Sequence, residues 1–255
     1  MNRAAVIAEL ADRIAAIHLD HPVRVGIDGV DASGKTMLAT ELVAPLRDRG
    51  RLVVRASIDG FHNPRAVRHR QGPASPRGYY EDSFNHEAIL SCVLLPLGPG
   101  GNRRFKPAVF DFRADSEVDY PWQDAPRDAV LLFDGVFLHR PELREHWDFT
   151  IFVQVGFDLT LKRAQRRDVH LFGSAERVRE VYRQRYIPGQ RLYLDAESPS
   201  QRADVVFDNT DIQNPALSRN EKANRRLQST SGPRGQNGSR EGRVTTRIKS
   251  PQDRR

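Results

Sequence analysis

Eight consecutive residues near the N-terminus match the pattern of a phosphate-binding loop. They read GVDASGKT and fit G-x-x-x-x-G-K-[ST]. Glycines in such a loop let backbone N–H groups turn toward phosphates, and the following helix adds positive potential. Lys35 would reach the β and γ phosphates, and the Thr36 hydroxyl would bind Mg²⁺. An ordinary glycine turn is the alternative. The predicted ATP-binding residues are Gly29, Val30, Asp31, Ala32, Ser33, Gly34, Lys35 and Thr36.

Two aspartates follow predicted strands and have side chains suited to phosphoryl transfer. Asp134 ends the apolar run VLLF, the arrangement of an acid that holds Mg²⁺ together with Thr36. Asp59 ends the second predicted strand, where a carboxylate could accept the proton of an attacking hydroxyl. A helix-capping or solvated Asp134 and a turn-forming Asp59 before Gly60 are the alternatives.

Three arginines lie on the helix predicted after residue 155. Arg163 and Arg167 are four residues apart, so they share one helix face, with Arg166 beside them. Arginines near a phosphate-binding loop can close over the transferring phosphates and neutralise developing charge. An exposed helix face is the alternative. The histidines show no spacing typical of metal ligands.

The elements that must position these residues alternate between strand and helix. Short apolar runs predict strands buried on both faces of a parallel sheet, and helical spacing of apolar residues predicts helices between them. This order predicts a doubly wound α/β fold with its ligand crevice at the carboxyl ends of the strands. The strands are predicted at 23–27, 52–58, 129–133, 149–155 and 203–207, the helices at 3–17, 35–47, 86–95 and from 158, and an irregular loop at 60–78.

Charge and composition divide the chain into a neutral body and a basic tail. The net charge is +7, yet residues 212–255 carry 11 basic and 3 acidic residues, which leaves about −1 for residues 1–211. We therefore predict a P-loop domain over 1–211, with its N-terminal helix in 1–20, and a disordered basic tail over 212–255. This division argues against a nucleic-acid-binding surface on the body.

The single cysteine, Cys92, excludes an intrachain disulfide and suits a reducing compartment. The N-terminus lacks the uninterrupted apolar core of a signal peptide, and no stretch approaches the length of a membrane helix. A cytoplasmic protein is expected.

Between residues 20 and 211 the sequence resembles the uridine kinase and phosphoribulokinase family of P-loop kinases. The matching segments, in the same order, are GVDASGKT, SIDGFHN, YYEDSFNHEAI, KPAVFDFRAD, VLLFDG, LKRAQRRD and ADVVFDN. The resemblance implies that Asp59 is the catalytic acid near the acceptor 5′-hydroxyl and that Asp134 replaces a more usual glutamate. It also implies a mobile lid that begins at Arg163, Arg166, Arg167 and Asp168.

The departures from the family pattern lie around the acceptor. Uridine kinases usually carry Asp-His-Pro where this chain has Tyr79-Tyr80-Glu81, Tyr at the position of Phe110 and His near Asp115. The residues that the resemblance places at the acceptor are Phe61, His62, Tyr79, Tyr80, Asp82, Phe110 and Arg113.

The predicted function is that of a kinase that uses ATP and Mg²⁺ and phosphorylates a hydroxyl of a small acceptor, with catalytic roles for Lys35, Asp59, Arg163 and Arg167. Uridine or cytidine, giving the 5′-monophosphate, is the favoured acceptor; a sugar phosphate, pantothenate or nicotinamide riboside is the alternative. A GTPase would need an Asn-Lys-x-Asp motif and an Asp-x-x-Gly motif after the third strand, and neither is present.

Overall fold

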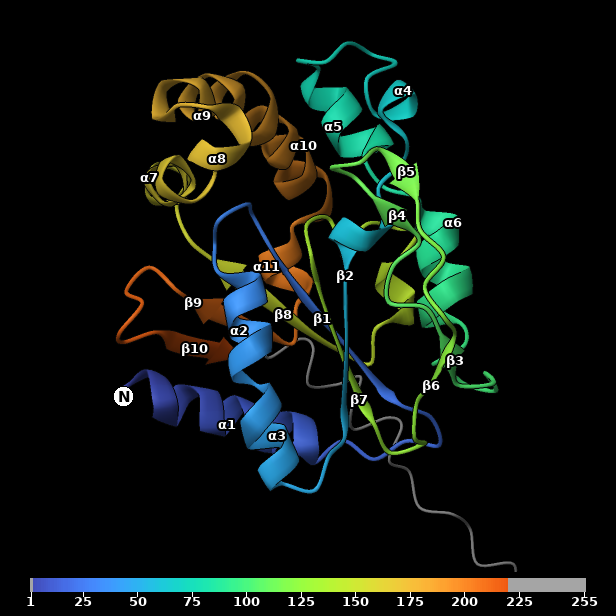
Figure 1. Cartoon of the computed structure of the whole chain (residues 1–255). Coiled ribbons are helices and arrows are strands. Elements are labelled where there is room, and N and C mark those ends of the chain that lie inside the picture. Colours follow the sequence, from blue (N-terminus) through green and yellow to red (C-terminus); the bar gives the residue numbers. More distant parts are fainter. Residues whose placement is uncertain (1, 220–255) are drawn as a thin grey trace, which may run out of the picture.

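A six-stranded sheet forms the centre of the molecule in the computed structural model, which describes residues 2–219 (Figure 1). The strand order is β10-β9-β8-β1-β7-β2, in which all neighbours pair in parallel except β10, which is antiparallel to β9. The predicted doubly wound α/β fold is confirmed. The strands are β1 (Val23–Gly29), β2 (Val53–Ser57), β7 (Val130–Gly135), β8 (Phe149–Gln154), β9 (Val205–Asp208) and β10 (Ala216–Arg219).

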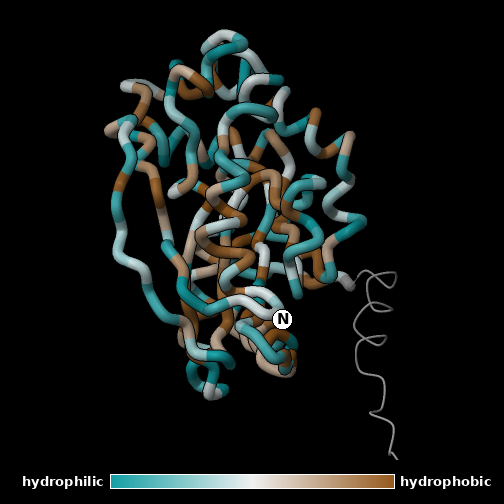
Figure 2. Tube along the Cα trace, turned by 90° about the vertical axis from the view of Figure 1, so that its right-hand side faces the viewer, coloured by the Kyte–Doolittle hydropathy of each residue, from teal (hydrophilic) through white to brown (hydrophobic). Residues whose placement is uncertain are grey.

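Both faces of the sheet are covered by helices, which explains the uninterrupted apolar runs in its strands. In β7, Val130 and Leu132 belong to one core while Leu131 and Phe133 belong to the other, because successive side chains of a strand point to opposite faces. In Figure 2 the hydrophobic segments gather in the interior of the trace. The sequence of such a strand is one continuous apolar run and does not alternate between apolar and polar residues.

The first face is covered by α1 (Arg3–Ala15), α2 (Lys35–Glu41) and α3 (Val43–Asp48). The side chain of Asn2 accepts a hydrogen bond from Ala5 N and so caps α1. Five apolar residues of α1 recur at helical spacing and are buried, as the predicted helix over 3–17 requires: Val6, Ile7, Leu10, Ala11 and Ile14.

The second core lies on the opposite face and is rich in aromatic rings. Phe133 packs against Phe61 and Trp147 with ring centroids 6.2 and 5.4 Å apart, and Tyr193 packs against Phe137 at 5.1 Å. The helices on this side are α5 (Pro76–Asp82), α6 (His86–Ile89) with a π-helical continuation (Leu90–Leu94), α10 (Ile187–Glu197) and α11 (Pro199–Arg202).

Two further groups of elements rise above the carboxyl ends of the strands. Helices α7 (Phe157–Arg167), α8 (Val169–Phe172) and α9 (Ala175–Val181), here called the lid helices, pack in a small core of their own and continue through a π-helical turn (Tyr182–Tyr186) into α10. Two short hairpins lie on the other side. They pair β3 (Arg104–Phe105) with β6 (Gln123–Asp124) and β4 (Phe110–Asp111) with β5 (Ser116–Glu117).

The structure differs from the predicted elements at three places. The helix predicted over 35–47 is divided at Leu42 into α2 and α3. The irregular loop predicted over 60–78 contains α4 (Arg65–Arg68) and the start of α5, which Ser75 caps by accepting a hydrogen bond from Gly78 N. The basic tail was predicted to begin at residue 212, yet the sheet continues through β10.

The physical reason for the last difference is that β10 is a short edge strand in which Ala216 and Ser218 are exposed and Leu217 is only partly buried, so it carries no apolar pattern. The remainder of the predicted tail, residues 220–255, lies outside the described residues. Within residues 2–219, no helix has the length and apolar character that crossing a membrane requires.

Candidate active site

The predicted phosphate-binding loop connects the end of β1 to the start of α2. Gly34 has a left-handed backbone (φ 104°), and a Cβ there would lie 2.5 Å from Asn209 Nδ2, so only glycine fits. Lys35 Nζ donates a hydrogen bond of 2.8 Å to Val30 O across the loop. Its side chain therefore lies along the concave side of the loop, as a phosphate ligand requires.

Four aspartates surround the Lys35 ammonium group. Burial lowers the pKa of Lys35, while the negative charges of Asp31, Asp28, Asp134 and Asp59 act in the opposite direction. These carboxylates come from the ends of β1, β2 and β7 and from the loop itself. The structure therefore brings together the lysine and the two aspartates that the sequence selected from three separate segments.

Thr36 and Asp134 lie side by side, as predicted for a magnesium site. Thr36 Oγ1 donates a hydrogen bond of 2.6 Å to Asp134 Oδ2, and Arg55 is paired with Asp134 Oδ1 at 3.0 Å. Hydroxyl and carboxylate oxygens suit Mg²⁺, which usually takes one or two protein oxygens and completes its shell with phosphate and water. The side chains thus fit the ion. No group of three His, Cys, Asp or Glu side chains within residues 2–219 could hold a metal.

Asp59 lies at the carboxyl edge of the sheet, in the 3-10 turn Ile58–Phe61 that follows β2. Its carboxylate is exposed to a cleft of about 990 Å³ and accepts no hydrogen bond from the described residues. The protein around the cleft displaces water and raises the pKa of Asp59, an effect that the nearby His62 opposes. A carboxylate without a protein partner is available to a hydroxyl group bound in the cleft.

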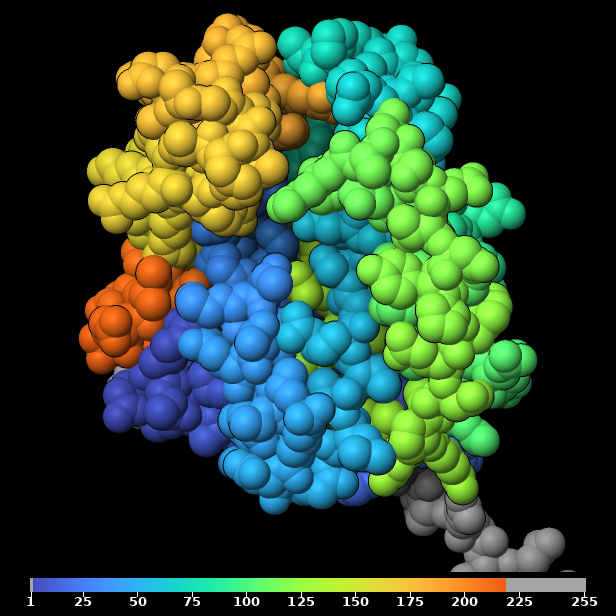
Figure 3. All heavy atoms as spheres, in the orientation of Figure 1, coloured from blue at the N-terminus to red at the C-terminus, as the bar shows by residue number. Residues whose placement is uncertain are grey.

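The same cleft is lined by Lys35, Thr36, Asp59 and Asp134. Figure 3 shows the molecule hollowed between the gold lid helices and the green segment that carries β4 and β5. Residues from the phosphate-binding loop, the sheet edge, the lid helices and a hairpin thus meet around one space. This arrangement can hold a nucleotide and a second small molecule close together.

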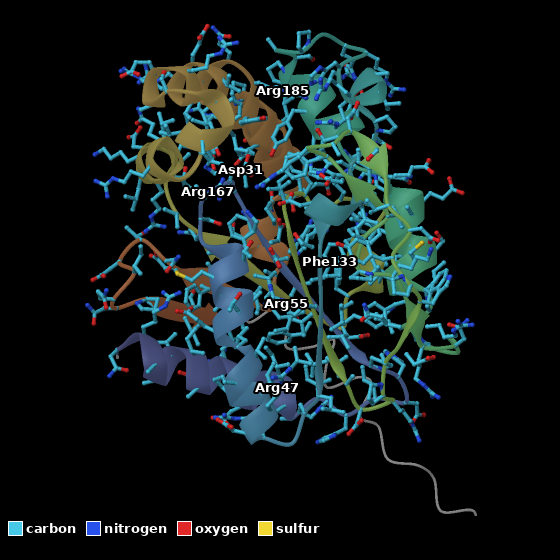
Figure 4. The ribbon with its side chains drawn as sticks, in the orientation of Figure 1. Asp31, Arg47, Arg55, Phe133, Arg167 and Arg185 are labelled. Atoms are coloured by element: carbon cyan, nitrogen blue, oxygen red, sulfur yellow. The ribbon has the colours of Figure 1, made fainter. Side chains whose placement is uncertain are left out.

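The predicted lid residues separate into two groups. Arg167 lines the cleft, and its guanidinium donates to both carboxylate oxygens of Asp168 at 2.6 and 3.0 Å, which raises the pKa of Arg167. Asp168 also accepts a hydrogen bond of 2.7 Å from Tyr182 OH. In Figure 4, Arg167 lies close to Asp31 of the phosphate-binding loop.

Arg163 and Arg166 do not line the cleft. Arg163 donates instead to the backbone carbonyls of Ser33, Asn209 and Thr210, at 3.4, 2.8 and 3.2 Å. The guanidinium of Arg163 is thus engaged by backbone carbonyls in this structure, and its role at the transferring phosphate stays a prediction. Arg166 is exposed on α7.

Three of the predicted acceptor residues line the cleft, namely His62, Tyr79 and Arg113. Phe61 and Phe110 are buried and do not line it, because apolar rings are more stable in the core. Tyr80 lies under the Arg140 guanidinium, 4.5 Å from the ring centroid. Asp82 is 2% exposed and is paired with Arg70 and Gln71. The structure places these four side chains outside the lining of the cleft, and their role at the acceptor stays a prediction.

Two buried networks that the sequence did not reveal support the loop. Gln190 of α10 accepts from Asp31 N at 2.8 Å and donates to Asp31 Oδ2 at 3.0 Å, and Tyr79 OH donates to the same oxygen at 2.8 Å. Asp28, which is fully buried, accepts from His139 Nδ1 at 2.8 Å and from Tyr193 OH. The charge of Asp28 near the end of a predicted buried strand was the one available signal.

The comparisons with known proteins agree with this geometry. No protein-family model matches the chain. It is 28% identical to uridine-cytidine kinase B of Dictyostelium discoideum over 153 residues, 60% of each protein. It is 26% identical to uridine kinase-like protein 5 of Arabidopsis thaliana over 205 residues, 79% of this chain and 42% of that protein. The chain therefore spans less than two thirds of the length of these relatives.

Solved structures share the same architecture. A possible uridine kinase from Bacillus stearothermophilus is 26% identical, with a TM-score of 0.63 over 79% of this chain and 97% of that one. D-glycerate 3-kinase from Cryptococcus neoformans is 12% identical, with a TM-score of 0.58 over 85% and 97%, a likeness of fold alone. The chain thus has the fold of the P-loop kinases and is similar in sequence to uridine kinases, so its predicted resemblance to the uridine kinase family is confirmed.

Proposed function

We propose that this chain transfers the γ-phosphoryl group of ATP to a hydroxyl group of a small acceptor. The observation that supports this proposal is that Lys35, Thr36, Asp59 and Asp134 line one cleft at the carboxyl edge of the sheet. Phosphoryl transfer depends mainly on positioning and on stabilising negative charge, and it needs a group that takes the proton of the nucleophile. In the cleft, Lys35 would stabilise negative charge, Thr36 and Asp134 would hold the metal ion that positions the phosphates, and Asp59 would take the proton.

The roles follow from where each group lies. The loop N–H groups and the Lys35 ammonium bind the β and γ phosphates, and Arg167 faces them from the lid helices. A magnesium ion held by Thr36 and Asp134 would supply further positive charge to these phosphates. The acceptor hydroxyl donates its hydrogen bond to the free Asp59 carboxylate, which takes the proton as the bond to phosphorus forms.

A pyrimidine nucleoside, uridine or cytidine, is the acceptor that the names of the relatives favour, with the 5′-monophosphate as product. Sugar phosphates and pantothenate are the alternative acceptors that carry a negative charge, and nicotinamide riboside is one that does not. Arginines in the cleft that lack a carboxylate partner favour the charged alternatives. We place the reaction in the cytoplasm, where ATP is available.

The experiment is an assay of ADP formation by the purified full chain with Mg²⁺ and ATP. The panel contains uridine, cytidine, sugar phosphates, pantothenate and nicotinamide riboside. We expect ADP to form only in the presence of one class of acceptor and to disappear when Mg²⁺ is chelated. ADP formation at the same rate with no acceptor would contradict a kinase and indicate a nucleoside triphosphatase.

A further inference from the structure

The cleft carries a surplus of positive charge that the phosphate-binding loop does not explain. Seven Lys and Arg side chains line it against four aspartates, a surplus of three positive charges. All four of these aspartates belong to the phosphate-binding loop, the sheet edge or the lid helices. Four of the cleft arginines come from elements that carry none of these aspartates. They are Arg65 and Arg68 of α4, Arg113 of the β4–β5 hairpin, and Arg185 of the π-helical turn before α10.

Three of these guanidinium groups have no carboxylate partner. Arg65, Arg113 and Arg185 form no ion pair with any described residue. Arg185 is only 8% exposed, yet its guanidinium donates to neutral groups: Pro73 O at 2.8 Å, His69 Nε2 at 3.1 Å and Arg68 O at 3.3 Å. Its Nε atom is buried without a partner. A buried charge without a counter-charge costs folding free energy.

The neighbourhood of Arg185 is organised to remain positive. Burial and the nearby charges of Arg185, Arg68 and Arg65 lower the pKa of His69, which suits an imidazole that accepts a hydrogen bond from Arg185. The rings of Tyr79 and Tyr186 face the same guanidinium, with centroids 5.8 Å away. Aromatic faces stabilise a cation without neutralising it.

Arg68 and Asp115 fix the relative positions of α4 and the hairpin. Asp115 Oδ1 accepts from Arg68 at 3.0 Å and from Arg65 N at 2.8 Å. Asp115 does not line the cleft. The clamp uses the side chain of Arg68 and the backbone N–H of Arg65, and it leaves the charges of the Arg65 and Arg113 side chains unused.

The three unpaired arginines, Arg65, Arg113 and Arg185, here called the arginine wall, line the same cleft as Asp59. Asp59, His62 and Arg68 follow one another on a single segment, and the charges of Asp59 and Arg68 both act on His62. In Figure 4, Arg185 lies above Asp31, on the side away from the sheet. A small molecule with a hydroxyl at Asp59 would therefore extend toward Arg65, Arg113 and Arg185.

We propose that the acceptor carries an anionic group, a phosphate or a carboxylate, which Arg65, Arg113 and Arg185 bind while its hydroxyl faces Asp59. This inference rests on the proposed function and specifies the class of its acceptor. The triphosphate of ATP is bound by the loop and Lys35, which leaves the arginine wall for the second substrate. Guanidinium groups bind phosphate and carboxylate oxygens through paired N–H donors.

The first test measures anion binding without catalysis. The full chain is saturated with AMP-PNP and Mg²⁺, so that the phosphate-binding loop is filled, and titrated with inorganic phosphate and with acetate in a calorimeter. The test variant is Arg65→Gln with Arg113→Gln, two exposed positions whose substitution leaves the core intact. Arg47→Gln, an exposed arginine on α3 far from Arg185 in Figure 4, is the matched control.

We expect the double variant to bind the anion at least about tenfold more weakly than the wild type and the control, since each charge-assisted hydrogen bond contributes to affinity. The better of the two anions identifies phosphate or carboxylate as the bound group. Equal affinity in the double variant and the wild type would overturn the proposal.

The second test measures turnover on matched pairs: D-ribose 5-phosphate against D-ribose, and D-glycerate against glycerol, with uridine beside them. We expect the charged member of one pair to have a kcat/KM at least about tenfold higher than its neutral partner, and the double variant to lose this difference. If the wild type and the double variant turn over uridine equally and neither phosphorylates a charged acceptor, the inference is overturned but the proposed kinase activity stands. Anion binding lost in the double variant, with no turnover of any acceptor, would support the arginine site and contradict the kinase.

Discussion

Lys35 is the residue on which the chemistry of the phosphate-binding loop depends most directly. Its ammonium group is the cation nearest to the loop and is surrounded by Asp28, Asp31, Asp59 and Asp134. When ATP binds, the β and γ phosphates add negative charge to a region that already contains four carboxylates. The positive charge of Lys35 offsets this repulsion from within the loop itself.

Replacement of Lys35 by Ala should therefore abolish phosphoryl transfer and leave the fold intact. The residue donates to Val30 O rather than packing in the core, so the melting temperature should change little. Turnover and thermal unfolding by circular dichroism are the measurements, with Lys162→Ala, an exposed lysine, as the control. Turnover of the Lys35 variant close to that of the wild type would mean that the loop does not bind the transferred phosphate.

At the scale of elements, α10 is the helix that connects the lid helices to the phosphate-binding loop. Gln190 is 2% exposed and forms two hydrogen bonds with Asp31, one through the backbone N–H and one through the carboxylate. One turn further along α10, Tyr193 OH donates to Asp28 at the end of β1. The position of α10 and the shape of the loop are thus fixed together.

We predict that Gln190→Leu raises the KM for ATP by about tenfold with a smaller effect on kcat, because the loss of two buried hydrogen bonds relaxes the loop but leaves Asp59 in place. Leu192→Ala, at an exposed position of the same helix, is the control and should leave both constants unchanged. Steady-state kinetics at saturating acceptor give both values. An unchanged KM with a reduced kcat would show that Gln190 acts on the chemical step instead.

Helix α6 provides a pH-dependent contribution to stability through His86. Burial and the charge of Arg140 lower the pKa of His86 from 6.5 to about 4, and its Nε2 atom is buried without a partner among the described residues. The unfolded chain therefore binds a proton at His86 more readily than the folded chain does. The stability due to neutral His86 is complete above pH 6.5 and is lost as the pH falls toward 4.

Between pH 6.5 and pH 5 this loss should amount to about 2 kcal/mol. Urea unfolding of the wild type at pH 7 and pH 5, compared with His86→Gln, measures it. The variant should be less sensitive to acid, whereas His18→Gln, an exposed control, should behave as the wild type. Equal acid sensitivity of His86→Gln and the wild type would contradict the assignment.

At the scale of the whole molecule, the C-terminal edge of the sheet closes against the N-terminus. Arg3 donates to Gln213 O through its backbone and to Ile212 O through its side chain, both at 3.0 Å. Leu217 of β10 packs against the core of the first face. Residues beyond Asp211 therefore contribute to the folded unit.

A chain that ends at Asp211 should lose roughly 5 °C or more in melting temperature, since β10 and its contacts are removed. A chain that ends at Arg219 is the matched control and should keep the melting temperature and turnover of the full chain, because residues 220–255 contain few apolar side chains. Equal melting temperatures of the two shortened chains would show that β10 does not stabilise the fold.

The sheet and the phosphate-binding loop could be predicted from sequence because both depend on local patterns. Apolar runs such as VLLF form strands that are buried between two layers of helices. In GVDASGKT the glycines that shape the loop and the lysine that binds phosphate lie in one continuous segment. The division of the helix at Leu42 and the strand β10 could not be predicted, since tertiary packing decides them and neither has a distinct pattern.

The acceptor side of the site was less predictable for a different reason. Arg185 and His69 are 116 residues apart, and only the packing of the π-helical turn against α4 brings them together. Conversely, Phe61 and Asp82 lie in segments that resemble a known family, yet their side chains are turned into the protein. Proximity to a motif does not determine the direction of a side chain.

The central claim is that Asp59 activates an acceptor hydroxyl beside a nucleotide bound by Lys35, and Asp59→Asn tests it most directly. Asparagine keeps the shape of the side chain but cannot take a proton, so kcat should fall by about 10² or more, while the KM for ATP, set by the loop, changes little. The wild-type kcat should also fall as the pH decreases through the raised pKa of Asp59. A variant with near-normal kcat and a much higher KM for ATP would contradict the account, because Asp59 would then be a ligand of the nucleotide and not the base.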